Sequence, residues 1–291
     1  MNYQVLLFYK YVTIEDPENF KQRVLDLATE CNLLGRVLIA EEGINGTLEG
    51  TTEQTEMFAQ ELLKDERLAG MQIKRSLGTG KAFPRLKIKV RAEIVGTRFP
   101  SSIDPRVKTA EHISPETLYN WYRNNEDFVV VDMRNDFEYQ SGHFKNSINP
   151  KLEASRDLVD AVSSLEPLKA KKVVTVCTGG VRCEKMSAYL LEQGFENVVQ
   201  LDNGIHSYME KYPGEDYAGT LYTFDKRLVM DFGGKREITG TCKLCGTQTE
   251  QYVNCANLGC HLHFLVCSTC FEGDKTYCSD DCLKSNLTLN T

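Results

Sequence analysis

The chain has 291 residues, of which 41% are hydrophobic and 26% charged, with a formal net charge of −7. This length accommodates two or three domains with cores of their own. No apolar run approaches the length needed to span a bilayer, and the short run at residues 5–8 leads into Lys10, so we expect neither a membrane contact nor a signal peptide. The sequence therefore predicts a soluble, cytoplasmic protein.

Strand-like and helix-like patterns alternate in the first 80 residues. We expect strands at residues 5–12, 36–40, 47–49 and 71–77, a turn at 41–46, and helices starting at Pro17 behind an Asp16 cap and at residue 51, the second running to residue 68. This β-α-β-β-α-β order is that of a ferredoxin-like split βαβ domain, which we assign to residues 1–98 as a candidate RNA-binding domain. One face of such a sheet stays open for RNA, for a ligand or for docking.

The charge is distributed unevenly along this domain. Residues 1–69 carry six Lys/Arg against thirteen Asp/Glu, whereas residues 71–110 carry ten against two. Residues 86–91 alternate apolar and basic side chains, so a strand there buries one face and presents cations on the other. A basic ribbon in an acidic protein suggests contact with a nucleic acid, the alternative being a solvated strand face and linker. The candidate RNA-binding residues are Lys74, Arg75, Lys81, Arg85, Lys87, Lys89 and Arg91.

A second domain follows a linker at residues 99–112, which is marked by Pro100, Ser101, Ser102 and Pro105. Residues 113–213 carry buried strand patterns at 128–131, 173–176 and 198–201 with helices between them, which predicts a parallel α/β sheet. A connector at residues 214–238 is expected to pack across this domain through Tyr217, Tyr222 and Phe224.

Cys177 lies where a buried strand turns into a helix. Unpaired amides and the dipole at the helix start, two glycines and Arg182 favour the thiolate there and allow the sulfur to carry an anion. The loop consists of Thr178, Gly179, Gly180 and Val181. We take Cys177, Arg182 and Cys183 as candidate catalytic residues. Cys183 is either a resolving partner or a residue of the helix, and the alternative for Cys177 itself is an inert buried cysteine.

Loop length separates the reactive alternatives. Four residues lie between Cys177 and Arg182, one fewer than in phosphatases of the cysteine class, and a tighter ring suits a sulfur atom carried on the cysteine. The loop resembles that of rhodanese sulfurtransferases, whose cysteine carries a persulfide, and residues 132–143 match the rhodanese pattern D-x-R-x-x-x-E-Y-x-x-G-H. The supporting candidates are Asp132, Arg134, Glu138 and His143. We expect Arg134 to pair with an acid such as Glu138, and His143 to orient a neighbour by a hydrogen bond.

Eight of the eleven cysteines form four pairs in the last 50 residues. The pairs are Cys242 and Cys245, Cys255 and Cys260, Cys267 and Cys270, and Cys278 and Cys282. In a cytosolic chain this spacing predicts two tetrahedral structural zinc sites in a module at residues 239–291. The pairs could combine in an interleaved or a sequential order, and His261 or His263 could replace a cysteine.

The combination of parts resembles the bacterial tRNA uridine(34) hydroxylase family over almost the whole chain, through the run 42–46 (EGING), the run 132–135 (DMRN) and the run 177–185 (CTGGVRCEK). The resemblance implies oxygen-dependent hydroxylation of the wobble uridine to 5-hydroxyuridine, with the anticodon loop of tRNA as the partner and the reactive cysteine at Cys177. We find no flavin or nicotinamide motif. Three routes for the hydroxylation step are compatible with these residues: a persulfide, a metal, or a covalent adduct of Cys177 with C6 of the base.

An unpaired base of the anticodon loop would need aromatic partners on which to stack. The candidates are Phe83, Phe99, Trp121 and Tyr139. Two other function classes are compatible with parts of the chain: a persulfide sulfurtransferase, which the loop alone would favour, and an RNA-binding protein without catalysis, against which the intact loop argues.

Overall fold

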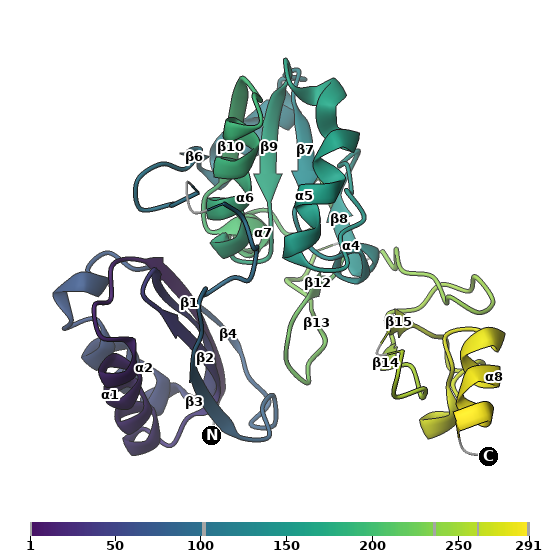
Figure 1. Cartoon of the computed structure of the whole chain (residues 1–291), viewed down its shortest axis with the longest axis horizontal. Coiled ribbons are helices and arrows are strands. Elements are labelled where there is room, and N and C mark those ends of the chain that lie inside the picture. Colours follow the sequence, from purple (N-terminus) through teal and green to yellow (C-terminus); the bar gives the residue numbers. More distant parts are fainter. Residues whose placement is uncertain (1, 101–102, 235–236, 261, 290–291) are drawn as a thin grey trace.

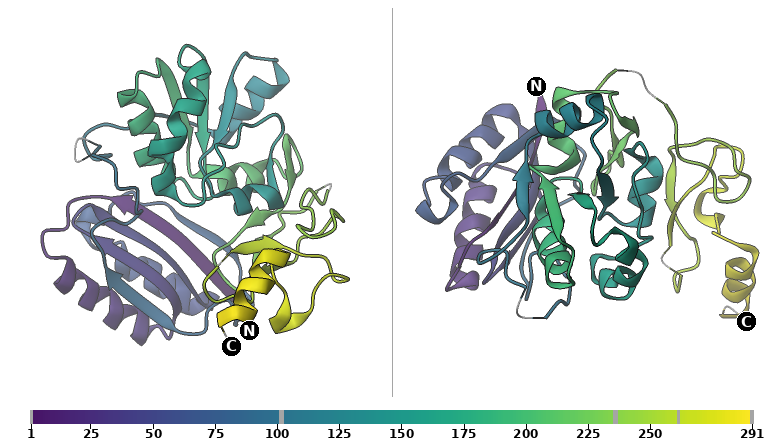
Figure 2. Two further views of the ribbon diagram at one scale, coloured as in Figure 1. Left: turned by 45° about the vertical axis from the view of Figure 1, so that its right-hand side comes forward. Right: turned by 90° about the horizontal axis from the view of Figure 1, so that it is seen from above.

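The computed structural model describes residues 2–100, 103–234, 237–260 and 262–289. They form an N-terminal sheet domain, a central α/β domain and a small C-terminal module (Figures 1 and 2). No helix in these ranges is long and apolar enough to cross a bilayer. Ser101 and Ser102 of the predicted linker lie outside the described residues.

The N-terminal domain is a twisted sheet with two helices on one face. Its elements are β1 (Tyr3–Tyr11), α1 (Pro17–Glu30), β2 (Leu34–Ala40), β3 (Gly43–Thr51), α2 (Thr52–Leu62), β4 (Ile73–Leu77) and β5 (Leu86–Val90). The strand order is β4-β1-β3-β2-β5, and only the β2–β5 pair is parallel. The ferredoxin-like fold predicted from the sequence is confirmed, and β5 adds a strand to its edge.

Two boundaries differ from the prediction. Strand β3 begins at Gly43, inside the predicted turn, because the chain reverses tightly after Ala40 and pairs at once with β1 and β2. Helix α2 ends at Leu62, and a separate 3₁₀ turn at Glu66–Leu68 follows it. The Asp65 side chain accepts a hydrogen bond from the Arg67 amide, which starts this new turn.

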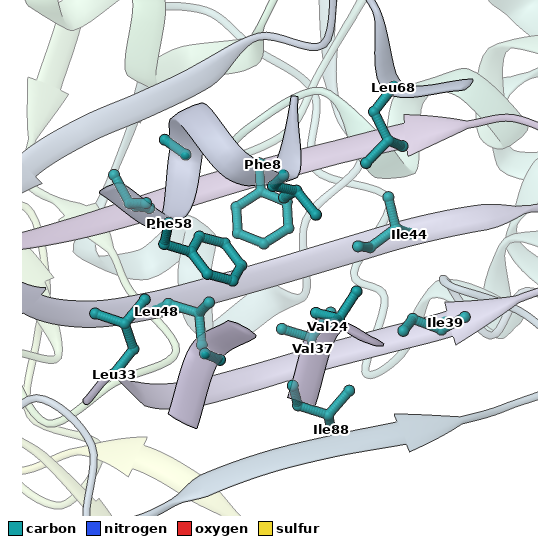
Figure 3. Close-up of a cluster of buried hydrophobic side chains, with 14 of the residues drawn as sticks. Phe8, Val24, Leu33, Val37, Ile39, Ile44, Leu48, Phe58, Leu68 and Ile88 are labelled. Atoms are coloured by element: carbon teal, nitrogen blue, oxygen red, sulfur yellow. The ribbon is translucent and has the colours of Figure 1, made fainter. Parts of the chain in front are cut away.

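The core of this domain lies between the sheet and its helices (Figure 3). Phe8 packs against Phe58 with ring centroids 6.1 Å apart, and Ile44 and Leu48 continue the same face of the sheet. Side chains at alternate positions of β1 therefore point toward the helices, and those between them point to the opposite face.

The central domain contains a parallel sheet in the order β6-β10-β9-β7. Its elements are β6 (Glu111–Ile113), α3 (Pro115–Arg123), β7 (Val129–Asp132), α4 (Asp136–Ser141), β8 (Gly142–Phe144), α5 (Leu158–Ala161), β9 (Lys172–Val176), α6 (Val181–Glu192), β10 (Asn197–Leu201) and α7 (Gly204–Lys211), with 3₁₀ turns at Ser155–Asp157 and Val162–Leu168. Residues 111–112, predicted as linker, belong to the edge strand β6, because they pair with β10.

The connector packs across the central domain as expected. Strand β11 (Tyr217–Gly219) pairs with β8, and β12 (Leu221–Tyr222) forms a hairpin with β13 (Val229–Met230). Tyr217 and Leu221 are buried in the core of the central domain. In Figure 1 the hairpin extends from the central domain into the space beside the N-terminal sheet.

The C-terminal module has little regular structure. It contains β14 (Tyr252–Asn254), β15 (His263–Leu265), a 3₁₀ turn at Gly273–Lys275 and α8 (Asp280–Leu289). Its buried cluster consists mainly of cysteines with Phe264 and Val266. A core this small does not stabilise a fold by itself, so the module needs cross-links or metal ions.

Candidate active site and metal centres

The Cys177 loop joins β9 to α6 at the carboxyl end of the parallel sheet. Gly180 has a left-handed φ of +101°, which bends the chain so that its amide donates to Cys177 Sγ at 3.2 Å. The start of α7 holds the loop from behind, because the amides of Ile205 and His206 donate to the carbonyls of Cys177 and Thr178. The predicted position of the cysteine at a strand-to-helix turn is confirmed.

The surroundings of Cys177 favour its thiolate. Burial alone would raise the pKa of Cys177, but hydrogen bonds from the Cys183 thiol and from the Arg182 and Cys183 amides, together with the positive charge of Arg182, lower it to about 6. Burial and the adjacent thiolate raise the pKa of Cys183 well above its usual range. Cys183 is therefore a protonated donor to Cys177, and the two cysteines form no disulfide.

Arg182 is locked in place by Glu138. Its guanidinium donates two hydrogen bonds to the Glu138 carboxylate, at 2.5 and 2.8 Å, and one to the Thr178 hydroxyl at 3.0 Å. The Glu138 side chain is fully buried, so the pair is shielded from solvent. This arrangement orients the guanidinium along the edge of the loop and keeps its charge close to Cys177.

Arg134 pairs with an acid of its own segment, as expected, but this acid is Asp132 and not Glu138, the example that the sequence suggested. Arg134 forms a fully buried ion pair with Asp132 at 2.7 Å and also donates to the carbonyl of Gly142. Both residues lie at the end of β7, so the Asp132 carboxylate is the closer partner, and Arg182 takes Glu138 instead. Asp132 and Arg134 therefore support the strand end and the segment that leads to His143.

His143 lies outside the Cys177 loop. Its ring stacks on Tyr139 with centroids 3.9 Å apart, and its Nδ1 is 2.9 Å from the carbonyl oxygen of Tyr139. Burial lowers its pKa. These contacts agree with an orienting role rather than with that of a base acting at Cys177.

The face of the N-terminal sheet opposite its helices covers the mouth of the Cys177 loop. A Cβ atom added at Gly180 would lie 2.6 Å from the hydroxyl of Tyr9, and one at Gly179 would lie 3.0 Å from the side chain of Leu7. Tyr11 also donates to the carbonyl of Val181 at 3.2 Å. Cys177 is consequently 0% exposed. One half of this face, formed by β1 and its neighbours, is thus a docking surface and is not open to RNA.

Lys74 lies at this covered interface and not on an exposed ribbon. Its side chain on β4 is buried, its Nζ lies 5.4 Å from the ring centroid of Tyr9, and among the described residues it has no hydrogen-bond partner. Burial lowers its pKa to about 8, while the negative charges of Cys177, Asp202 and Glu210 act in the opposite direction. Lys74 therefore faces the Cys177 loop across the interface.

The other candidate cations remain near the surface. Arg75 is engaged in a two-fold ion pair with Glu56, which neutralises it. Lys81, Arg85, Lys87 and Arg91 are exposed, and Lys89 is half-buried. The neighbouring charges of Lys87 and Arg91 lower the pKa of Lys89, so β5 carries a dense positive charge. This cationic half of the sheet lies beside the half that docks.

The four aromatic candidates for base stacking are all engaged within the fold. Phe99 stacks on Tyr189 with centroids 4.4 Å apart, and Tyr139 stacks on His143. Phe83 is buried, and Trp121 packs on Phe128 with Lys172 over its ring. Each of these four side chains is therefore buried or already packed against another ring of the fold.

The eight cysteines of the C-terminal module form two groups. Within each group the four Sγ atoms lie within 4.8 Å of one another: Cys242, Cys245, Cys267 and Cys270 in one, Cys255, Cys260, Cys278 and Cys282 in the other. Sγ atoms of Cys245 and Cys267 are 3.6 Å apart, too far for a disulfide and near the roughly 3.8 Å edge of a tetrahedron with Zn–S bonds of about 2.3 Å. The residues therefore fit two metal ions in the interleaved order.

Histidine is not needed as a ligand in either group. His263 binds elsewhere, with Nε2 3.2 Å from the Tyr222 hydroxyl and Nδ1 2.9 Å from the Asn254 side-chain oxygen. His261 lies outside the described residues. Four thiolates around each ion would leave no open coordination position, which is typical of structural zinc.

Family models match the chain in three parts: a UPF0176 acylphosphatase-like domain over residues 3–94, a rhodanese-like domain over 114–211 and a rhodanase C-terminal domain over 218–283. The chain is 42% identical over 287 residues to a protein of Bacillus velezensis named tRNA uridine(34) hydroxylase, covering 96% of this chain and 88% of that protein. A protein of Cytophaga hutchinsonii with the same name is 39% identical over 282 residues, which cover 97% of this chain and 90% of that protein. The chain belongs to the tRNA uridine(34) hydroxylase family. Among solved structures, a rhodanese-like domain protein of Staphylococcus aureus is 28% identical with a TM-score of 0.30, covering 34% of this chain and 90% of that chain.

In this member of the tRNA uridine(34) hydroxylase family, the structure brings residues to the site to which the sequence analysis gave no role. Glu184, in the first turn of α6, accepts hydrogen bonds from Tyr9 at 3.1 Å and from Gln200 at 3.2 Å, and its carboxylate lies 3.0 Å from His112 Nε2. The hydrogen bond with Glu184 raises the pKa of His112. One signal was present in the sequence: Tyr9 and Tyr11 lie on the face of β1 opposite its core residues, which indicates a strand covered on both faces.

Proposed function

We propose that this chain hydroxylates C5 of the wobble uridine, position 34 of tRNA, to give 5-hydroxyuridine, with molecular oxygen as co-substrate. The full-length similarity to proteins named tRNA uridine(34) hydroxylase supports the substrate and the reaction. The observation that carries the proposal is the Cys177 thiolate, held at a pKa of about 6 inside a rhodanese loop that a second domain covers.

The residues of the loop have distinct roles in this proposal. Cys177 is the reactive sulfur, and the Gly180 amide and the Cys183 thiol stabilise negative charge on it. Arg182, held by Glu138, supplies the permanent positive charge. Asp132, Arg134 and His143 act at a distance by supporting the strand end that carries this loop.

The C-terminal module would bind two structural zinc ions through its eight cysteines. Zinc in an all-thiolate site stabilises the fold and takes no part in chemistry, because no ligand position is open. We infer that the chain acts in the cytoplasm, where thiols remain reduced and free to bind metal.

Exposed cations on the N-terminal domain would supply the phosphate contacts that hold tRNA. We assign these contacts to Lys81, Arg85, Lys87, Lys89 and Arg91, and not to Lys74 or Arg75, since Lys74 is buried and Arg75 is paired. Contacts of this kind are independent of sequence and weaken steeply with salt.

The second candidate is a persulfide sulfurtransferase, which the four-residue spacing between Cys177 and Arg182 favours. One experiment distinguishes the two reactions. The purified holoprotein is incubated with unmodified tRNA and a cellular reductant fraction under air and under argon, and the nucleosides are analysed by mass spectrometry. We expect a gain of one oxygen on uridine that depends on air. A gain of sulfur would instead support the sulfurtransferase. Unchanged nucleosides under air and under argon would contradict both reactions.

Two variants make the same experiment specific for the loop. Cys177→Ala should abolish the reaction and leave tRNA affinity intact. Cys31→Ala is the matched control, because Cys31 is also a buried free thiol but belongs to the N-terminal core. Activity in Cys177→Ala equal to that of the wild type would overturn the proposed role.

A further inference from the structure

A groove of about 590 Å³ lies where the three parts of the chain meet. Its walls come from β2 and the segment before β5 in the N-terminal domain, from Phe137 of α4, from the β12–β13 hairpin, and from Asn254 and His263 of the C-terminal module. The views in Figures 1 and 2 place the hairpin between the other parts. Of its lining residues, the sequence indicates Arg85 and Lys87 as RNA-binding candidates and Phe83 as a stacking candidate, but no motif indicates the groove itself or a role for Phe224 in RNA binding.

Four exposed cations line one side of the groove: Arg36, Arg85, Lys87 and Lys226. Arg36 and Lys87 are direct neighbours on the parallel strands β2 and β5, and they point to the same face of the sheet. Within the part of the chain that the structure describes, none of the four has an ion pair. Among the described residues that line the groove, Asp225 is the only one with a carboxylate, and it is buried and already paired with Arg227. The groove therefore presents uncompensated positive charge.

Phe224 offers an exposed aromatic surface in the same groove. Its side chain is 47% exposed, and its ring is held edge-on by Tyr222 at 5.2 Å and by Phe137 at 6.2 Å between centroids. The guanidinium of Arg36 also donates to the carbonyl of Phe224, which ties the hairpin to the N-terminal domain. An aromatic ring fixed in this way and bordered by cations is the usual platform for an unpaired nucleic-acid base.

The platform adjoins the active-site loop. The guanidinium carbon of Arg182 lies 5.8 Å from the ring centroid of Phe224, and Arg182 also binds the hydroxyl of Thr178. Thr178 directly follows Cys177 and is partly exposed. A nucleotide seated on Phe224 would thus be next to the loop that carries the reactive sulfur.

We propose that this groove binds single-stranded RNA of the anticodon loop, with one base stacked on Phe224 and the flanking phosphates on Arg36, Arg85 and Lys87. The inference rests on the proposed function for the identity of the RNA. The positive charge argues for a polyanion, and the single ring platform in a groove of this volume suits an unpaired base rather than a duplex. The C-terminal module then contributes a wall of the RNA site through Asn254 and His263.

Binding is tested separately from the reaction. The full-length, zinc-loaded protein is titrated by fluorescence anisotropy against an anticodon stem-loop RNA and against a blunt RNA duplex of equal length. The variants are Phe224→Ala and Lys87→Ala. Their controls are Phe271→Ala, which removes another exposed ring (44%), and Lys171→Ala, which removes an exposed lysine directly before β9, at the end of the sheet opposite the loop.

We expect Phe224→Ala to weaken stem-loop binding roughly 5- to 160-fold, which corresponds to the loss of one stacked base, without a change in duplex binding. Lys87→Ala should weaken binding and reduce its salt dependence, and the two controls should bind as the wild type does. A stem-loop with 2-aminopurine at position 34 should lose fluorescence on binding to the wild type and keep it with Phe224→Ala.

A second measurement locates the base directly. With 4-thiouridine at position 34, irradiation should cross-link the RNA to the groove, and mass spectrometry should find the adduct on the segment 222–226 or on Phe137. Cross-links confined to other surfaces, or wild-type RNA affinity in Phe224→Ala, would contradict the assignment of the groove as an RNA site. The groove would then be a candidate site for a protein partner. Hydroxylation of tRNA by a Phe224→Ala protein of unchanged affinity would reject the groove while retaining the proposed function. RNA binding in the groove without any hydroxylation of uridine would support the groove and contradict the proposed function.

Discussion

The hydroxyl of Tyr9 donates a hydrogen bond of 3.1 Å to the carboxylate of Glu184, joining the N-terminal sheet to the first turn of the helix behind Cys177. The same carboxylate binds His112 and Gln200, so it connects the edge and the centre of the parallel sheet with the covering domain. A polar contact between two domains is thus part of the cover over Cys177.

Removing this contact should loosen the cover over Cys177. We expect Tyr9→Phe to cost about 1 kcal/mol, the usual contribution of one hydrogen bond, because His112 and Gln200 still satisfy Glu184. Hydrogen exchange of the amides at residues 177–182 should become faster, as should alkylation of Cys177. Tyr3→Phe, on the same strand but outside the interface, is the control, and equal exchange rates in the two variants would contradict this role.

The reactivity of Cys177 should depend on pH with a midpoint near 6 rather than near the usual value for cysteine. A lowered pKa means that the thiolate is lost only as the pH falls through 6, so the alkylation rate should rise about tenfold per pH unit below 6 and level off above it. The rate is measured with iodoacetamide on zinc-loaded protein, with Cys177→Ser subtracted. A rate that is still rising steeply above pH 8 would count against the lowered pKa.

Lys74 should contribute to this lowered pKa from across the interface. Lys74→Met removes a buried positive charge that interacts with the Cys177 thiolate, so the midpoint for alkylation should move to higher pH. Lys74→Arg keeps the charge and should keep the midpoint close to that of the wild type. Identical alkylation midpoints in the wild type and both variants would show that the charge of Lys74 does not act on Cys177. If Lys74 served only to stabilise the fold, Lys74→Met would shift the unfolding transition and leave the alkylation midpoint of Cys177 unchanged.

The buried pair of Asp132 and Arg134 should be important for stability. Arg134→Met leaves the Asp132 carboxylate buried without its counter-ion, so we expect a loss of about 3–5 kcal/mol in the free energy of unfolding. Urea denaturation monitored by circular dichroism measures this loss. Lys64→Met, which breaks the exposed pair with Glu61, should change the stability little.

Metal removal should affect RNA binding without changing the Cys177 loop. A strong chelator should release two zinc ions per chain, one for each cysteine group. Asn254 lines the groove and directly precedes the ligand Cys255, so stem-loop affinity should fall, while the pH midpoint of Cys177 should stay unchanged. Atomic emission and anisotropy measure the two effects on one sample, and undiminished affinity in the metal-free protein would separate the module from the RNA site.

Local patterns predicted most of the fold. Strand and helix periodicity, the Asp16 cap and the cysteine spacing each depend on neighbouring residues, and the structure bears them out. The ligand pairing was left open, because spacing alone does not distinguish interleaved from sequential sites.

The parts that sequence reasoning missed depend on contacts between distant segments. Charge counting treats every lysine as exposed, and the docking of two domains buries Lys74. Phe224 stayed without a role in RNA binding because its platform exists only where a hairpin meets α4 and β2. Arg134 had three acids within four residues, and only the geometry of the strand end selects Asp132.

The interleaved cysteine groups impose an order on biosynthesis. During translation the first metal site stays incomplete until Cys270 has emerged from the ribosome, and the second until Cys282 has emerged. By then the two preceding domains have left the exit tunnel and can already be folded. If the two sites hold zinc as proposed, a cell starved of zinc would accumulate chains with an assembled Cys177 loop and an unfinished wall at the groove.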